Sequence, residues 1–150
     1  MEQIKDLLRA ILSTSVNKFT GGDDPALKLF VDMLSRLPKT AVIAALKEYY
    51  AFPPGNFYDH SHMMKLLQRE LARELGYKSA SEAWEIIQYL RRTVGVRQTP
   101  ITPAIVTETL DYYGGWVLSV DKMTEQGFML VYQDKLDKIT KKIIMEALNE

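Results

Sequence analysis

Apolar residues recur at intervals of three and four along almost the whole chain, and this spacing limits what the chain can fold into. Ile4, Leu8 and Ile11 show it near the start, and Ile139 and Ile143 show it near the end. Residues three or four apart lie on one face of an α-helix, whereas a half-buried strand needs strict alternation. No segment alternates in this way. We therefore expect an all-α protein, a compact bundle of about seven helices with short loops.

Proline and glycine divide this pattern into separate helices. Asp24 and Thr102 each precede a proline and are expected to cap the second and sixth helices. Ser81 is expected to cap the fifth helix, and Gly76 and Gly95 to stop the fourth and the fifth. The predicted helices span residues 2–19, 25–37, 39–50, 62–75, 81–94, 102–113 and 124–148.

The length of 150 residues is sufficient for one domain with its own core. We expect a single helical domain over residues 1–150, with a division into parts 1–75 and 81–150 as the alternative. No apolar run reaches the ~18 residues that indicate a membrane span. The chain also has no cysteine, which fits a reducing compartment. A cytoplasmic protein is expected, in the host cytoplasm if the chain is viral.

The charge balance argues against a strongly basic nucleic-acid binder. The chain has 19 basic and 19 acidic residues, so its formal net charge is zero. Arg91, Arg92 and Arg97 are a local exception. The favoured interpretation is that they complement the negative end of the helix over 81–94. Direct binding of nucleic acid is expected to be weak or absent.

Few side chains are arranged as a catalytic or metal site would require. Asp59, His60 and His62 form a metal-like cluster, but a solvated loop that caps the following helix is favoured. Glu70 and the other glutamates are expected on solvent faces. Phosphate-binding and dinucleotide-binding glycine motifs are missing from the sequence. We expect no enzyme activity, no metal and no cofactor.

Two groups of aromatic residues stand beside helix-breaking residues. Phe52, Phe57 and Tyr58 lie in a loop with two consecutive prolines, and we expect them to tuck this loop back onto the core. Tyr112, Tyr113 and Trp116 flank Gly114-Gly115, and core packing around this tight corner is favoured over an exposed binding site.

The last helix is the best candidate for contact with a protein partner. Its C-terminal half carries an apolar stripe that either docks on the core or binds another protein, and docking is favoured. The candidate partner-binding residues are Lys135, Lys138, Ile139, Lys142, Ile143 and Leu148.

Two segments carry a family resemblance. Residues 27–54 read as an apolar helix, a break at Pro38, a second helix and then Phe52-Pro53-Pro54. The second segment contains Ala83-Trp84, Thr102-Pro103, Gly114-Gly115-Trp116, and Phe128 four residues before Tyr132. In their order and spacing these segments resemble phage replicative-helicase loader and inhibitor proteins, and together they cover about two-thirds of the chain.

The resemblance implies a non-enzymatic adaptor. Such a protein binds a hexameric replicative helicase, holds it inactive and helps to deliver it to an origin marked by an initiator protein. The alternative is a small helical DNA-binding or phage regulatory or inhibitor protein. In that case the helices over 81–94 and 102–113 form a helix-turn-helix-like pair, with Arg91, Arg92 and Arg97 on phosphates.

Overall fold

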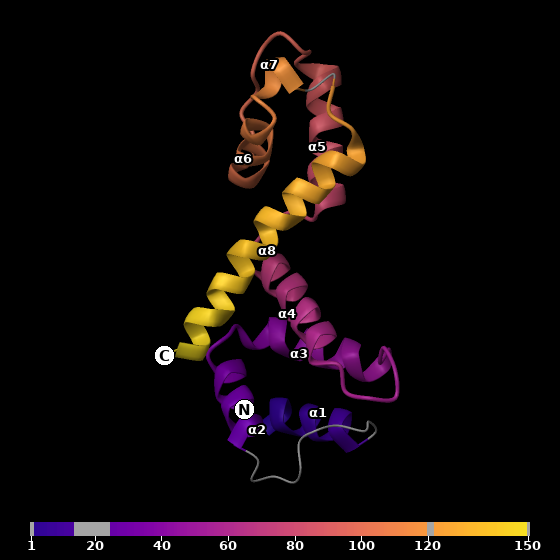
Figure 1. Ribbon diagram of the computed structural model, residues 1–150, viewed down its shortest axis with the longest axis vertical. Coiled ribbons are helices and arrows are strands. Elements are labelled where there is room, and N and C mark those ends of the chain that lie inside the picture. Colours follow the sequence, from indigo (N-terminus) through magenta and orange to yellow (C-terminus); the bar gives the residue numbers. More distant parts are fainter. Residues whose placement is uncertain (1, 14–24, 120–121, 150) are drawn as a thin grey trace. The chain divides into compact units, whose positions relative to one another are not determined.

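The protein is all-α, as the apolar spacing predicts. The computed structural model describes residues 2–13, 25–119 and 122–149, and within these ranges it contains eight helices and no strand (Figure 1). The additional helix relative to the prediction is a single turn, α7. The helices are α1 (Glu2–Ser13), α2 (Pro25–Ser35), α3 (Lys39–Ala51), α4 (His60–Glu74), α5 (Ala80–Thr93), α6 (Ala104–Tyr112), α7 (Trp116–Ser119) and α8 (Glu125–Asn149).

Most predicted helix ends agree with the structure to within two residues. Pro25 begins α2, and Pro38 is the residue before α3. Gly76, Gly95 and the Gly114-Gly115 pair have positive φ, the conformation in which a glycine stops a helix at low cost. The predicted end of the first helix at Phe19 and the predicted cap Asp24 lie outside the described residues.

The predicted cap of α5 was wrong. The N-cap is Ser79, whose side chain accepts a hydrogen bond from the backbone N–H of Glu82, while the Glu82 carboxylate accepts one from the N–H of Ser79. This reciprocal pair is a capping box, and it satisfies two backbone donors at the same helix end. Ser81 lies inside the first turn. The spacing Ser79-x-x-Glu82 was readable in the sequence.

The start of α6 also differs from the prediction. Pro103 is the N-cap, and no side chain caps the helix. The hydroxyl of Thr102 instead lies 2.6 Å from the hydroxyl of Thr107, which also donates to the Thr102 carbonyl. Thr102 therefore closes the corner before α6 through the second turn of the helix.

The chain divides into two compact units, Met1–Tyr77 with Thr140–Glu150, and Lys78–Ile139. In the first unit, α1 to α4 and the C-terminal end of α8 share one hydrophobic core. Its fully buried members include Leu8, Leu34, Leu46, Met63 and Leu67.

The C-terminal end of α8 is docked on this core, as predicted for its apolar stripe. Ile144 and Ala147 are buried members of the core, and Leu148 packs against it. Two polar contacts accompany them. Arg36 donates a hydrogen bond of 2.8 Å to the carbonyl of Ala147, and Gln68 donates one of 3.2 Å to the hydroxyl of Thr140.

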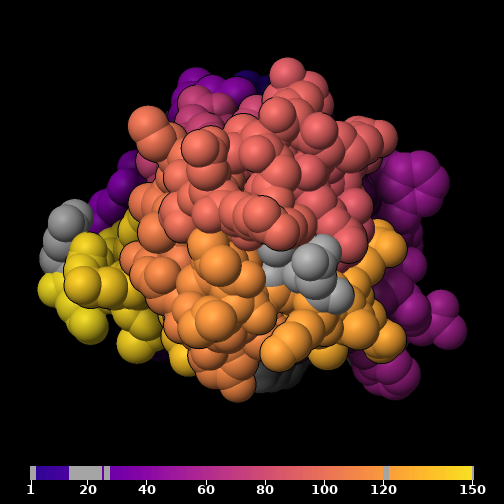
Figure 2. All heavy atoms as spheres, turned by 90° about the horizontal axis from the view of Figure 1, so that it is seen from above, coloured from indigo at the N-terminus to yellow at the C-terminus, as the bar shows by residue number. Residues whose placement is uncertain are grey.

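In the second unit, α5, α6, α7 and the first part of α8 bury a set of aromatic side chains. Trp116, Phe128 and Tyr132 are buried, and the ring of Trp84 lies 5.5 Å from that of Phe128. Figure 2 shows the face of this unit that the end of α5, residues 94–103, α6 and α7 form, in salmon to orange. The motifs Ala83-Trp84, Gly114-Gly115-Trp116 and Phe128 with Tyr132 thus belong to one packed region.

The capping box gives a first test of the fold. Replacing Ser79 by Ala removes an N-cap, so we expect a loss of about 1 kcal/mol in the free energy of unfolding. Ser81→Ala is the matched control, since Ser81 is exposed within the first turn and alanine favours helix. Denaturant unfolding of both variants measures the difference. Equal losses would contradict the cap assignment.

The docking of α8 gives a second test. We expect Ile144→Ala to destabilise the protein by about 2–5 kcal/mol, because it leaves a cavity in the core of the first unit. The neighbouring Met145 is half exposed, so Met145→Ala should change the free energy of unfolding by less than about 0.5 kcal/mol. A small effect at Ile144, measured by urea unfolding, would mean that α8 does not complete this core.

Candidate interaction surfaces

The loop between α3 and α4 exposes two phenylalanines. We call residues 52–59 the aromatic loop. Phe52 and Phe57 have exposed fractions of 74% and 69%, so the expectation that they tuck onto the core was wrong. Only Tyr58 is half-buried and packs against the first-unit core. Residues 54–60 line an open hollow on this surface.

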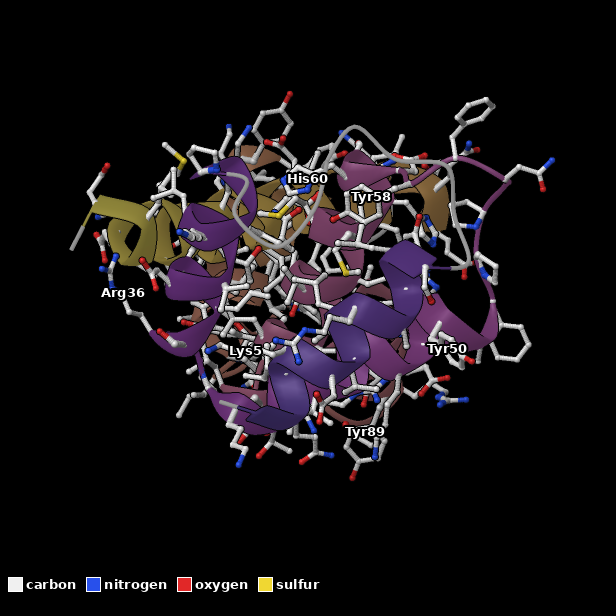
Figure 3. All side chains as sticks on the ribbon, turned by 90° about the horizontal axis from the view of Figure 1, so that it is seen from below. Lys5, Arg36, Tyr50, Tyr58, His60 and Tyr89 are labelled. Atoms are coloured by element: carbon white, nitrogen blue, oxygen red, sulfur yellow. The ribbon has the colours of Figure 1, made fainter. Side chains whose placement is uncertain are left out.

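The end of the aromatic loop is anchored to α3 and to the start of α4. The hydroxyl of Tyr49 accepts a 2.8 Å hydrogen bond from the backbone N–H of Asp59. The Tyr58 ring lies 5.6 Å from the Tyr49 ring, and its hydroxyl is 3.0 Å from Nδ1 of His60 (Figure 3). Tyr58 and Asp59 both contact Tyr49, and the prolines restrict the backbone of the preceding residues.

Burial raises the pKa of the Tyr58 phenol, and the nearby Tyr49 and Asp59 add to the shift. The phenol therefore stays protonated in the folded protein well beyond the pH at which an exposed tyrosine ionises. A protonated hydroxyl can donate to or accept from Nδ1 of His60, according to the tautomer of the ring.

The cluster of Asp59, His60 and His62 acts as a helix start. The Asp59 carboxylate accepts a hydrogen bond from the backbone N–H of His62 and caps α4. The His60 ring packs edge-on against Phe30, and the His62 ring lies 5.8 Å from Tyr49. Among the described residues, no group of three or more His, Asp or Glu side chains is placed to hold a metal ion. The capping interpretation is confirmed.

Glu70 is buried, so its predicted place on a solvent face was wrong. Its carboxylate lies 3.0 Å from Arg69 and 3.5 Å from Arg73, and Arg69 also pairs with Glu48 on α3. A buried carboxylate needs such partners, because an unpaired charge in the interior costs several kcal/mol. These ion pairs join α3 to α4 and give Glu70 a structural role.

The corner at Gly114-Gly115 in the second unit is flanked by one buried and one exposed aromatic residue. Trp116 is buried and its Nε1 donates a 3.1 Å hydrogen bond to the carbonyl of Gly95, as core packing predicts. Tyr112 is 68% exposed, which contradicts the prediction for that residue. Tyr113 is half-buried and meets the Tyr112 ring edge-on. The corner therefore presents an aromatic side chain to solvent.

The candidate partner-binding residues of α8 divide into two kinds. Ile143 and Leu148 are half-buried and pack against the first-unit core. Lys138 and Lys142 are exposed, and Lys138 pairs with Asp134 across one turn at 3.0 Å. Lys135 and Ile139 are half-buried. The exposed lysines are the part of this set that another molecule can reach directly.

The three arginines of the alternative function lie at the end of α5 and just beyond it, and all are exposed. The helices α5 and α6 do not form a helix-turn-helix. Residues 94–103 separate them, whereas that motif has a turn of about 3–4 residues. Moreover, α6 has no basic residue and exposes Glu108 and Asp111, which would repel the phosphates beside a major groove.

Comparisons with family models, with curated proteins and with solved structures give no match to this chain. Across the described residues, no helix combines the length and the apolar character that crossing a bilayer requires.

The raised pKa of Tyr58 predicts a loss of stability at alkaline pH. Above pH ~10 the unfolded chain releases the phenol proton while the folded chain keeps it, so stability falls as pH rises. This one group should cost about 1.4 kcal/mol at pH 11. Tyr58→Phe removes that contribution. Urea unfolding of both proteins at pH 8 and pH 11 measures it, and parallel losses in the two would contradict it.

Proposed function

We propose that this protein is a non-enzymatic replication accessory protein of the phage helicase-loader type, which binds a hexameric replicative helicase and controls its loading or activity. The observation that carries the proposal is the exposure of Phe52 in the Phe52-Pro53-Pro54 segment. That segment belongs to the resemblance, and a phenylalanine that served only the core would be buried.

The aromatic loop has the properties of a protein-binding surface. Two large apolar rings project from a loop whose prolines limit its freedom, so little conformational entropy remains to be lost when a partner binds. Binding energy at protein interfaces is concentrated in a few buried anchors, and aromatic residues are frequent among them. Phe52 and Phe57 are the proposed anchors in an apolar pocket of the helicase.

The second segment of the resemblance supports the proposal in another way. Trp116 and Phe128 are buried in the second unit and the half-buried Trp84 packs beside Phe128, so these motifs contribute to the packing of the fold. The exposed lysines Lys138 and Lys142 are proposed contacts for a second partner, such as an origin-binding initiator.

The proposal predicts that the protein co-purifies with a hexameric replicative helicase and changes its ATPase rate. A panel of bacterial helicases serves as bait. In the complex that forms, Phe52→Ser with Phe57→Ser should weaken binding about thirtyfold or more, because each ring is a proposed anchor. Both residues are exposed, so circular dichroism should show the fold unchanged.

The matched control is Tyr112→Ser, which removes an exposed aromatic ring from the second unit. It should leave helicase binding unchanged. If no helicase of the panel is retained and no ATPase rate changes, the proposed function is wrong. If the control weakens binding as much as the double variant, the aromatic loop is not the contact surface.

A further inference from the structure

The end of α5 and the segment after it form a locally basic surface on a chain with no net charge. Residues 86–107 contain Arg91, Arg92 and Arg97 and neither aspartate nor glutamate. Arg92 and Arg97 are exposed, and neither forms an ion pair with a carboxylate in the described part of the chain. Their charges are therefore available to an anionic partner.

An exposed tyrosine accompanies these charges. Tyr89 is 60% exposed and its ring projects away from the ribbon (Figure 3). Because Tyr89 and Arg92 are three residues apart on α5, their side chains lie on one face of the helix. This pairing places a flat aromatic surface beside a guanidinium group.

The segment that carries Arg97 is held in place next to this helix end. Gly95 closes α5 with a hydrogen bond from its N–H to the carbonyl of Leu90, and its own carbonyl accepts the hydrogen bond from Trp116. Arg97 follows two residues later. These two hydrogen bonds at Gly95 hold the chain just after α5, which limits how far Arg97 can move from Arg92.

We propose that this surface binds single-stranded nucleic acid, with a base stacked on Tyr89 and with Arg92 and Arg97 on the backbone phosphates. Opposite charge selects a polyanion, and the exposed ring selects one whose bases are unstacked. A duplex offers no free base to Tyr89. The acidic α6 would also disfavour entry of the neighbouring helix into a groove.

The small number of contacts predicts weak binding that depends strongly on salt. Single strands lose about 0.7 in the slope of log K against log salt for each phosphate contacted. The two arginines therefore give a slope of about −1.4, or roughly twenty-five-fold weaker binding for a tenfold rise in salt. This agrees with the expectation from the neutral net charge that binding at physiological salt is weak.

The test uses the full chain and a fluorescently labelled oligothymidine of about 12 nucleotides, within the usual site size of such proteins. Anisotropy is measured from 20 to 200 mM salt. Binding with the predicted slope is expected. Tyr89→Ala should weaken it at least about fivefold, and Tyr89→Phe should keep it, because stacking needs the ring but not the hydroxyl. Arg92→Gln with Arg97→Gln should make the slope about 1.4 units shallower.

The matched control for charge is Lys39→Gln with Lys141→Gln, which removes two exposed charges from the first unit and should leave the slope unchanged. The proposal is overturned if the oligonucleotide does not bind at 20 mM salt, if a duplex or polyglutamate binds equally well, or if the tyrosine or arginine variants bind as the wild type does. The arginine variant should still bind a helicase, so the outcome is independent of the function proposed above.

Discussion

The burial of Ile144 and Ala147 against α1 to α4 is the contact on which the first unit depends. Without these two side chains its core would expose an apolar face, and each large aliphatic side chain taken out of water contributes about 1.5–3 kcal/mol. The hydrogen bond from Arg36 to the Ala147 carbonyl adds a second function. It satisfies one of the backbone acceptors that every helix leaves free at its C-terminal end. The same turn of α8 therefore provides both the apolar contacts of the core and the hydrogen bond to the Ala147 carbonyl.

The second unit closes through hydrogen bonds from aromatic side chains to backbone carbonyls. Trp116 donates to Gly95, and the Tyr132 hydroxyl donates to the Lys78 carbonyl at 2.7 Å. A buried indole or phenol needs such a partner. These bonds anchor the chain just before and just after α5, and they leave Tyr89 and Arg92 exposed.

The sequence predicted the helices well because their boundaries are set by local chemistry. Pro25, Pro38 and the positive-φ glycines act through their own backbones, so their effect is readable without knowledge of the fold. Burial was harder to predict, because it depends on what each element meets. Glu70 is buried and pairs with Arg69 and Arg73, whereas Phe52 is exposed in the loop whose Tyr58 packs beside Tyr49. The spacing of apolar residues in the sequence does not predict that Glu70 is buried and Phe52 exposed.

The exposure of side chains on the proposed contact surfaces was equally hard to predict from the sequence. The Phe-Pro-Pro segment and the arginines could be singled out from the sequence, but which of their side chains face solvent could not. The exposure of Tyr89 could not be predicted from the sequence, because a tyrosine in an amphipathic helix is usually expected to pack against the core. Its position three residues before Arg92 was the available signal, and it gains meaning only once the ring is known to be exposed.

Because α8 contributes to both cores, the order in which the chain is synthesised matters. Domains usually fold as they leave the ribosome, the N-terminal one first. Here α1 to α4 cannot complete their core until residues 144 and 147 have been made, long after α4 itself. The core of the nascent first unit therefore remains incomplete, with apolar side chains exposed, while the second unit is translated. The first unit is therefore expected to complete its core only after the second unit has been translated.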